Sequence, residues 1–214
     1  MSQLHIGKIK QFVNANKNLF NGALFSLFFF FFKGLIFLLL FVLANYIGPN
    51  AYGFLSFFST LLTVFGFIIA LSSEGYLSFS YFRDAENGIS ESCSSSVLIT
   101  LLIGTLLLVI ELIWGGKLEP YIHLDTEITC YAILISIFTI YLNLHLNILR
   151  VKEKVISFGF LTISNALLNF VLSIFLVSTL VLGWKGRIYA NLICGLLFGV
   201  ISIYYILKKH YLHI

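Results

Sequence analysis

Six long apolar runs dominate the sequence, and their length is the feature that most limits the fold. Each run lasts roughly 20 residues or more, which is the length that a helix needs to cross about 30 Å of hydrocarbon. Of the 214 residues, 59% are hydrophobic and only 10% are charged, whereas soluble domains carry about 25% charged residues. A water-soluble globule with this composition would expose a large apolar surface. The sequence therefore predicts an all-α fold, a polytopic membrane bundle of six transmembrane helices.

The predicted spans are separated by short segments rich in glycine, proline or charged residues, which end helices or return the chain to water. A polar segment precedes the first span, and we interpret the whole chain as a single six-helix transmembrane domain. The polar segment covers residues 1–20, and the six predicted spans cover approximately 22–46, 54–80, 97–114, 128–149, 157–182 and 188–207. The predicted connections include polar loops at 83–96 and 115–127 and a tight turn at 183–187.

Lysine and arginine set the expected orientation, because the cytoplasmic loops of membrane proteins are enriched in them. Of the 13 lysines and arginines, three (Lys117, Lys185 and Arg187) fall on the side opposite the N-terminus, and Lys33 falls inside the first span. The others share the side that holds the N-terminus, so both termini are predicted to be cytoplasmic. This role accounts for the net charge of +4, and no nucleic-acid partner is expected.

Lys33 lies near the middle of the first predicted span. At 1.5 Å per residue it is about 12 residues, or roughly 18 Å, from either end, which is too far for a lysine side chain to reach. A charge at this depth costs roughly 2.5–3.5 kcal/mol on insertion scales, and such residues usually face the bundle interior or a watery cavity. One interpretation is that Lys33 binds an anion, such as a phosphate, in a central cavity. The alternative is a structural residue that is paired with a carboxylate or is neutral.

Six polar side chains within the predicted spans are the candidate substrate-binding residues. Glu74 can pair with a cation, bind substrate or carry a coupling proton, because a carboxyl group in a low-dielectric medium retains a proton. The asparagines repeat at helical spacing, which puts each group on one face of its helix. Such faces either line a hydrophilic lumen or form hydrogen bonds between helices. The candidates are Lys33, Glu74, Asn143, Asn147, Asn165 and Asn169.

Catalytic and metal-binding motifs are absent from the sequence. It contains no glycine-rich phosphate loop, no HExxH motif and no Gly-x-Ser-x-Gly motif. The three cysteines do not have the spacing of metal ligands. The predicted loops are also too short to build a catalytic domain. We therefore expect a non-enzyme with no catalytic residues, no bound metal and no cofactor.

Residues 32–56 and three later segments carry a family resemblance. The first span ends in the turn Gly48-Pro49-Asn50-Ala51-Tyr52-Gly53, and the second closes on Ser73-Glu74-Gly75 followed by Tyr81-Phe82-Arg83. The sixth span begins with Tyr189-Ala190-Asn191-Leu192-Ile193. This pattern resembles the N-terminal lobe of the polysaccharide flippases, the O-antigen and capsule exporters of the multidrug/oligosaccharidyl-lipid/polysaccharide (MOP) exporter superfamily.

The resemblance implies a transporter of the bacterial inner membrane that moves undecaprenyl-diphosphate-linked oligosaccharide units by alternating access for O-antigen or lipopolysaccharide biosynthesis. Members of the family have two six-helix lobes around a central, often cationic cavity, and Lys33 fits this feature. Six spans correspond to the N-terminal lobe alone. We therefore expect pairing with a second copy or a separately encoded second half, unless the chain is a truncated reading frame.

Two other functions stay open. One is a multidrug or metabolite exporter of the same superfamily, in which Glu74 would serve cation exchange and Lys33 would fit poorly. The other is a non-transporting, truncated membrane subunit with a structural or assembly role.

Overall fold

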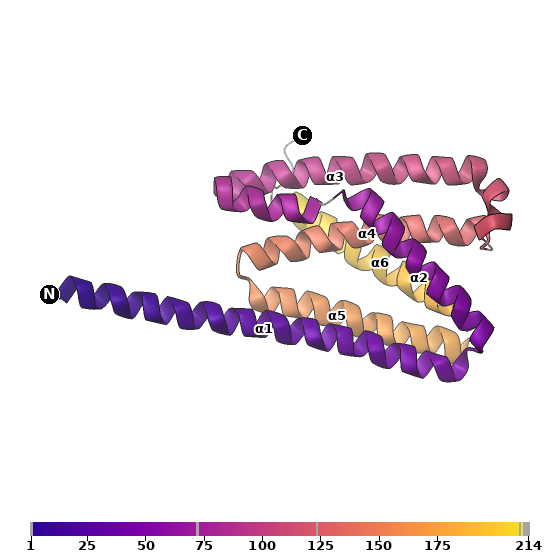
Figure 1. The fold of residues 1–214 in the computed structure, drawn as a ribbon, viewed down its shortest axis with the longest axis horizontal. Helices are drawn as coiled ribbons and strands as arrows, with labels where there is room; N and C mark the ends of the chain where they lie inside the picture. Colours follow the sequence, from indigo (N-terminus) through magenta and orange to yellow (C-terminus); the bar gives the residue numbers. More distant parts are fainter. Residues whose placement is uncertain (1, 72, 123, 210, 212–214) are drawn as a thin grey trace.

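The computed structural model describes residues 2–71, 73–122, 124–209 and 211. Every regular element in these ranges is helical, and six segments are long and apolar enough to cross a membrane, so the predicted all-α, six-span architecture is confirmed (Figure 1). The elements are α1 (Ser2–Tyr46), α2 (Pro49–Ala70), α3 (Ser73–Ile122), α4 (Thr126–Val151), α5 (Val155–Ile174), the π-helical turn η1 (Phe175–Thr179) and α6 (Gly183–Lys208). The membrane-spanning segments are 19–46, 49–84, 87–117, 126–151, 155–179 and 183–208.

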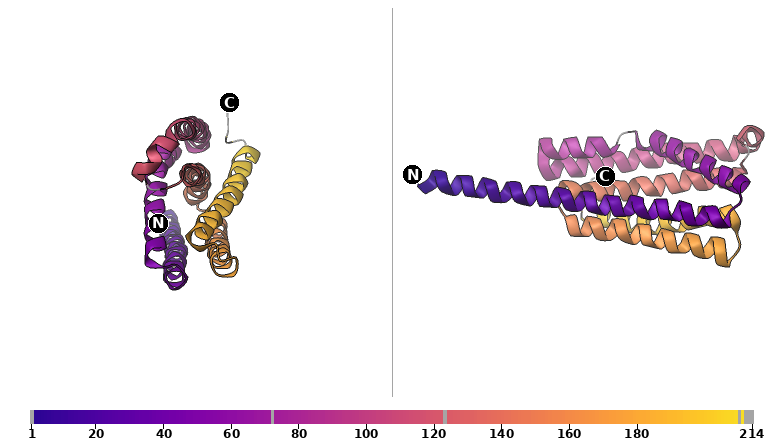
Figure 2. Two further views of the ribbon diagram at one scale, coloured as in Figure 1. Left: turned by 90° about the vertical axis from the view of Figure 1, so that its right-hand side faces the viewer. Right: turned by 60° about the horizontal axis from the view of Figure 1, so that its bottom comes forward.

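Helix α4 is the centre of the bundle, with α3, α2 and α6 packed around it, as the end-on view shows (Figure 2). In its most apolar stretch 72% of the residues are buried, against 11% in α1. Apolar side chains that recur on successive turns of α4 meet those of α3 and α6, and this contact makes the main core. The core includes Ile133, Ile137, Ile140, Leu144 and Ile148 from α4, with Leu77, Ile89, Cys93 and Ile206 from its neighbours.

Helix α1 lies alongside α5, on the far side of the bundle from α3 (Figure 1). Many of its large apolar side chains point outward: Phe30 is 78% exposed and Phe37 is 70% exposed. A helix that is apolar on nearly every face suits contact with lipid. Lys33 is the one charged residue in the spanning part of α1, residues 19–46.

The Gly48-Pro49 step joins α1 to α2. Proline suits the first helical position, because its fixed φ is already helical and no N–H is needed there. Helix α2 accordingly begins at Pro49, five residues before the predicted start of the second span at Phe54.

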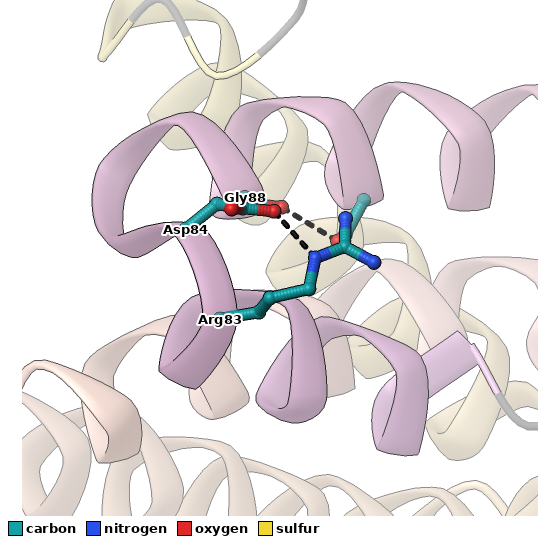
Figure 3. A network of polar contacts seen from close by, with 4 residues as sticks. Arg83, Asp84 and Gly88 are labelled. Atoms are coloured by element: carbon teal, nitrogen blue, oxygen red, sulfur yellow. Dashed lines mark hydrogen bonds and ion pairs between the residues drawn. The ribbon is translucent and has the colours of Figure 1, made fainter.

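The second predicted span is interrupted, and the polar loop predicted at 83–96 is helical. Leu71, with φ at 40°, ends α2 in the left-handed region, and α3 then reverses direction near Arg83 (Figures 1 and 3). A Cβ atom on Gly88 would lie 2.1 Å from the Ser80 carbonyl oxygen, although eight residues of straight helix cover about 12 Å. At the bend, Arg83 Nε donates to Asp84 Oδ2 at 2.6 Å.

Two further predicted connections are helical in the structure. Helix α3 continues to Ile122, through most of the loop predicted at 115–127, and α6 begins at Gly183 instead of after a turn at 183–187. Packing explains the early start of α6. The Trp184 ring stacks on Phe54 of α2 at 5.4 Å, and Gly186 lies close to the backbone of η1. Arg187 therefore belongs to the second turn of α6.

The spanning start of α1, the α4–α5 connection and the end of α6 lie at one end of the bundle. Asn21 Nδ2 donates to Glu153 Oε2 at 3.3 Å, and Lys152 Nζ donates to the hydroxyl of Tyr211. The assignment of this end to the cytoplasm stays a prediction.

Candidate substrate cavity

A cavity of about 330 Å³ lies between α1, α4 and α5, with the first turn of α3 at its edge. Five of the six candidate residues line it, although they come from four helices. Helix α1 contributes Lys33, α3 contributes Glu74, α4 contributes Asn143 and Asn147, and α5 contributes Asn165. The sixth candidate, Asn169, lines an adjoining cavity of about 160 Å³, whose wall also includes Asn165.

The Lys33 ammonium group is held by aromatic rings. Its Nζ atom lies 5.4 Å from the centroid of the Phe29 ring and 5.9 Å from that of Phe32. Such cation–π contacts contribute roughly 0.5–2 kcal/mol and offset part of the cost of the charge. Glu74 lines the same cavity, but within the described ranges no carboxylate forms an ion pair with Lys33. Its positive charge is therefore not neutralised by these residues.

Glu74 lies in the first turn of α3, directly after the break at Leu71. A carboxylate there is stabilised by the partial positive charge at the start of a helix. This position gives Glu74 a structural role that does not require a ligand, and its side chain is half-buried at the edge of the cavity.

Arg150 adds a second cation to the cavity, and the sequence analysis missed it. The residue occupies the last turn of α4, where Nη1 donates to Asn147 Oδ1 at 3.1 Å and the guanidinium carbon lies 5.5 Å from the centroid of the Phe158 ring. Its charge was assigned to topology because it follows the apolar run. Arg150 lies three residues after Asn147, and side chains at this spacing are neighbours on a helix. This spacing is the sequence pattern from which the contact could have been predicted.

The smaller cavity contains a third cation, Arg187, which the sequence analysis placed in an outer turn. Arg187 Nη1 donates to Asn169 Oδ1 and, at 2.6 Å, to Ser173 Oγ. Asn169 Nδ2 donates in turn to Asn191 Oδ1 at 3.0 Å. The Asn169 amide thus accepts with its oxygen and donates with its nitrogen, which fixes its orientation. Asn191 lies four residues after Arg187, which puts both residues on one face of α6. This spacing is the sequence pattern from which the polar cluster could have been predicted.

A groove of about 510 Å³ runs along the outside of α1 and shares a wall with the larger cavity. Lys33 and Arg150 line both spaces, together with Phe29 and Phe158. Beyond the two cations the groove is mostly apolar, and Phe25 packs edge-on against Phe158 at 5.0 Å. The two positive charges therefore lie where an amide-lined cavity meets an apolar surface that faces lipid.

Comparison with known proteins finds two similar sequences in one bacterium. No family model matches the chain. A protein of the Lsg locus of Haemophilus influenzae is 28% identical over 177 residues, which cover 81% of this chain and 41% of that protein. A membrane protein of the same organism is also 28% identical over 177 residues, covering 81% of this chain and 40% of its own length. The chain thus spans less than half of the curated relatives that it matches.

Solved structures identify the fold. An outward-facing multidrug resistance MATE family transporter of the MOP superfamily matches with a TM-score of 0.67 and 14% identity, over 89% of this chain and 46% of that one. A MATE mutant matches at 0.66 with 15% identity, over 88% and 44%. A Pyrococcus furiosus MOP transporter, whose pocket of reverse polarity suggests a different function, matches at 0.63 with 16% identity, over 89% and 44%. The six helices have the fold of part of a MATE transporter.

The chain therefore shares its fold with solved transporters of the expected superfamily. The narrower prediction, membership of the polysaccharide flippases, stays a prediction.

Proposed function

We propose that this chain forms one lobe of a transporter that moves a lipid-linked oligosaccharide across the bacterial inner membrane by alternating access. The proposal rests chiefly on one observation. Lys33 and Arg150 line one cavity, and within the described part of the chain neither is paired with a carboxylate. A diphosphate that crosses the bilayer has to give up water, and cations inside the bundle offset that cost.

The amides suit the sugar part of such a substrate. Sugar hydroxyls both donate and accept hydrogen bonds, and each asparagine amide offers two donors and an accepting oxygen. Asn143, Asn147 and Asn165 line the same cavity as the two cations. In this arrangement the amides contact the oligosaccharide while the charges hold the diphosphate.

The groove on α1 suits the lipid part. A lipid-linked substrate carries its hydrocarbon chain directly beside its phosphates. The groove adjoins the cavity at Lys33 and Arg150, and Phe25, Phe30 and Phe158 line it. The hydrocarbon chain can therefore stay against aromatic rings at the lipid boundary while the headgroup enters the cavity.

A multidrug exporter is the second candidate. Glu74 lines the same cavity, and a carboxylate is the group that attracts cationic drugs. A multidrug resistance transporter is among the proteins with this fold. In either case we propose that this chain corresponds to one lobe of a larger transporter, because the match covers only 44–46% of the two MATE chains.

Ligand binding by the purified chain in nanodiscs distinguishes the two candidates without the second lobe. Farnesyl diphosphate serves as the anionic probe and ethidium as the cationic probe, and calorimetry gives both dissociation constants. The double variant Lys33→Ala/Arg150→Ala should bind farnesyl diphosphate at least tenfold more weakly, because charge-assisted contacts contribute about 1.5–3 kcal/mol each and tenfold is about 1.4 kcal/mol. Lys117→Ala, which removes an exposed lysine of α3, should leave the affinity unchanged.

Two results would contradict the proposal. One is unchanged farnesyl diphosphate affinity in the double variant. The other is tight ethidium binding that disappears in Glu74→Gln, which would favour the multidrug exporter.

A further inference from the structure

Arg187 is fixed in position by a set of neutral side chains. With the residues that the structure describes it forms two hydrogen bonds, and both leave from Nη1, one to Asn169 Oδ1 and one to Ser173 Oγ. Ser173 Oγ itself donates to the Asn169 carbonyl oxygen at 2.6 Å, and the Asn169 amide is held by Asn191. The guanidinium plane is therefore oriented by helices α5 and α6 before any ligand arrives.

Within the described ranges, the charge of Arg187 has no counter-charge in its surroundings. Its hydrogen-bond partners are neutral, and among the residues that the structure describes no carboxylate forms an ion pair with it. An arginine side chain does not lose its proton in proteins. The positive end of helix α6, which begins at Gly183, adds to the same positive potential. A charge of this kind inside a membrane bundle attracts an anion.

The side chain also keeps donors for a ligand. A guanidinium carries five N–H donors, and its Nη2–Nε edge matches two oxygens of a phosphate or carboxylate. The described residues form no hydrogen bond with Nη2 or Nε, and Arg187 lines the smaller cavity. That cavity, about 160 Å³, is far larger than the roughly 10–15 Å³ that one water requires.

We propose that Arg187 forms a second anion site, which binds a phosphate or diphosphate group through the Nη2–Nε edge of its guanidinium. The first site, formed by Lys33 and Arg150, lies in the larger cavity, and Asn165 and Phe32 line both cavities. One anion thus binds at the two sites in sequence and passes Asn165 between them. The identity of the substrate rests on the proposed function, whereas the affinity of Arg187 for phosphate does not.

The chain contains a reporter for this site. It has two tryptophans, and Trp184 lies one helical turn before Arg187. The variant Trp114→Phe leaves Trp184 as the single tryptophan. Titration of this protein with inorganic pyrophosphate, in nanodiscs of uncharged lipid, should give a saturable change in Trp184 fluorescence, and its midpoint gives the affinity.

In that background Arg187→Gln should raise the pyrophosphate midpoint at least tenfold. Arg187→Lys, which keeps the charge but loses the planar fork, should raise it less. Lys185→Gln is the matched control, because it removes the same charge two residues away, where Lys185 is exposed and paired with Asp125 at 3.4 Å. The control should leave the midpoint unchanged. Helix content measured by circular dichroism verifies that each variant is folded. If Arg187→Gln does not fold, Arg187→Lys tests the site in its place.

The outcomes separate this site from the proposed function. Loss of the pyrophosphate response in Arg187→Gln, with the response retained in Lys33→Ala/Arg150→Ala, supports an independent second site. An unchanged midpoint in both Arg187 variants, or an equal loss in Lys185→Gln, overturns it. Farnesyl diphosphate binding that depends on Lys33 and Arg150 would leave the proposed function standing even then.

Discussion

Where α3 packs against α4, the side chains fill the space between the helices. A Cβ atom on Gly104 would lie 2.6 Å from the side chain of Ile137, and Leu144 and Ile148 are fully buried on the same side of α4. Where α1 faces α4, α5 and α6, the side chains instead line two cavities and carry amides and positive charges. The first region has the close packing of a protein interior, and the second has polar groups whose full complement of partners is not supplied by the described residues.

This contrast indicates that stability and binding depend on different sides of the bundle, which meet at α4. A substitution in the α3–α4 region should lower the free energy of unfolding and leave anion affinity alone. A substitution that removes a positive charge from the cavities should weaken anion binding without lowering stability. Each of the four variants below tests one side of this separation.

The largest effect on stability is expected at Gly88, in the bend of α3. Gly88→Ala puts a Cβ atom 2.1 Å from the Ser80 carbonyl oxygen, and a backbone atom cannot rotate away as a side chain can. We expect a loss of about 3 kcal/mol in the free energy of unfolding, measured by circular dichroism during titration with sodium dodecyl sulfate. Gly116→Ala is the control in the same helix, because a Cβ atom there meets nothing within 4 Å. Equal stability of the two variants would mean that the bend is not tight.

Lys33→Met should change the free energy of unfolding in the opposite direction. Methionine keeps the length of the side chain and removes a mid-membrane charge that has no carboxylate partner among the described residues. The free energy of unfolding should rise by about 2 kcal/mol, while farnesyl diphosphate affinity falls. The same titration measures the first quantity and calorimetry the second. Lys117→Met is the control, because Lys117 lies at the end of its spanning segment, 87–117. A loss of stability would identify Lys33 as a structural residue and remove it from the binding site.

The sequence predicted the spans well because their apolar length is a local property. Lys33 and Asn165 were identified as candidates because a polar group inside an apolar run is visible without a structure, and both line a cavity. The sequence analysis misplaced Arg187 because the start of α6 depends on Trp184 packing against α2, a contact distant in sequence. The reversal of α3 near Gly88 was missed for a different reason. The charged residues there resemble a loop in the sequence, but they remain helical in the structure.

A smaller effect is expected where α4 meets α6. His145 Nδ1 lies 3.2 Å from Ser202 Oγ, and the His145 ring stacks on Tyr205 at 4.0 Å between centroids. Both hydrogen-bonding groups are buried, and hydrogen bonds between helices in membranes average about 0.6 kcal/mol. Ser202→Ala should lower the free energy of unfolding by about that amount. Ser95→Ala removes a hydroxyl whose one hydrogen bond to the described residues goes to the Glu91 carbonyl oxygen of its own helix, and this variant should lower the free energy of unfolding less. No difference between the two would show that the contact adds nothing.

The smallest effect is expected at Glu74, although this carboxylate lines the same cavity as Lys33 and Arg150. If the cavity binds anions, Glu74 repels the ligand slightly and serves mainly to stabilise the start of α3. The farnesyl diphosphate affinity of Glu74→Gln should therefore differ by no more than about threefold, which is less than 1 kcal/mol. Its stability should fall by about 0.3–1 kcal/mol, the usual contribution of an acid in the first turn of a helix. Calorimetry and unfolding of the same preparation measure both quantities, with Glu91→Gln, an exposed acid in the middle of α3, as the control. A tenfold or greater loss of farnesyl diphosphate binding would mean that the carboxylate contacts the ligand, and the cations alone would then no longer account for what the cavity selects.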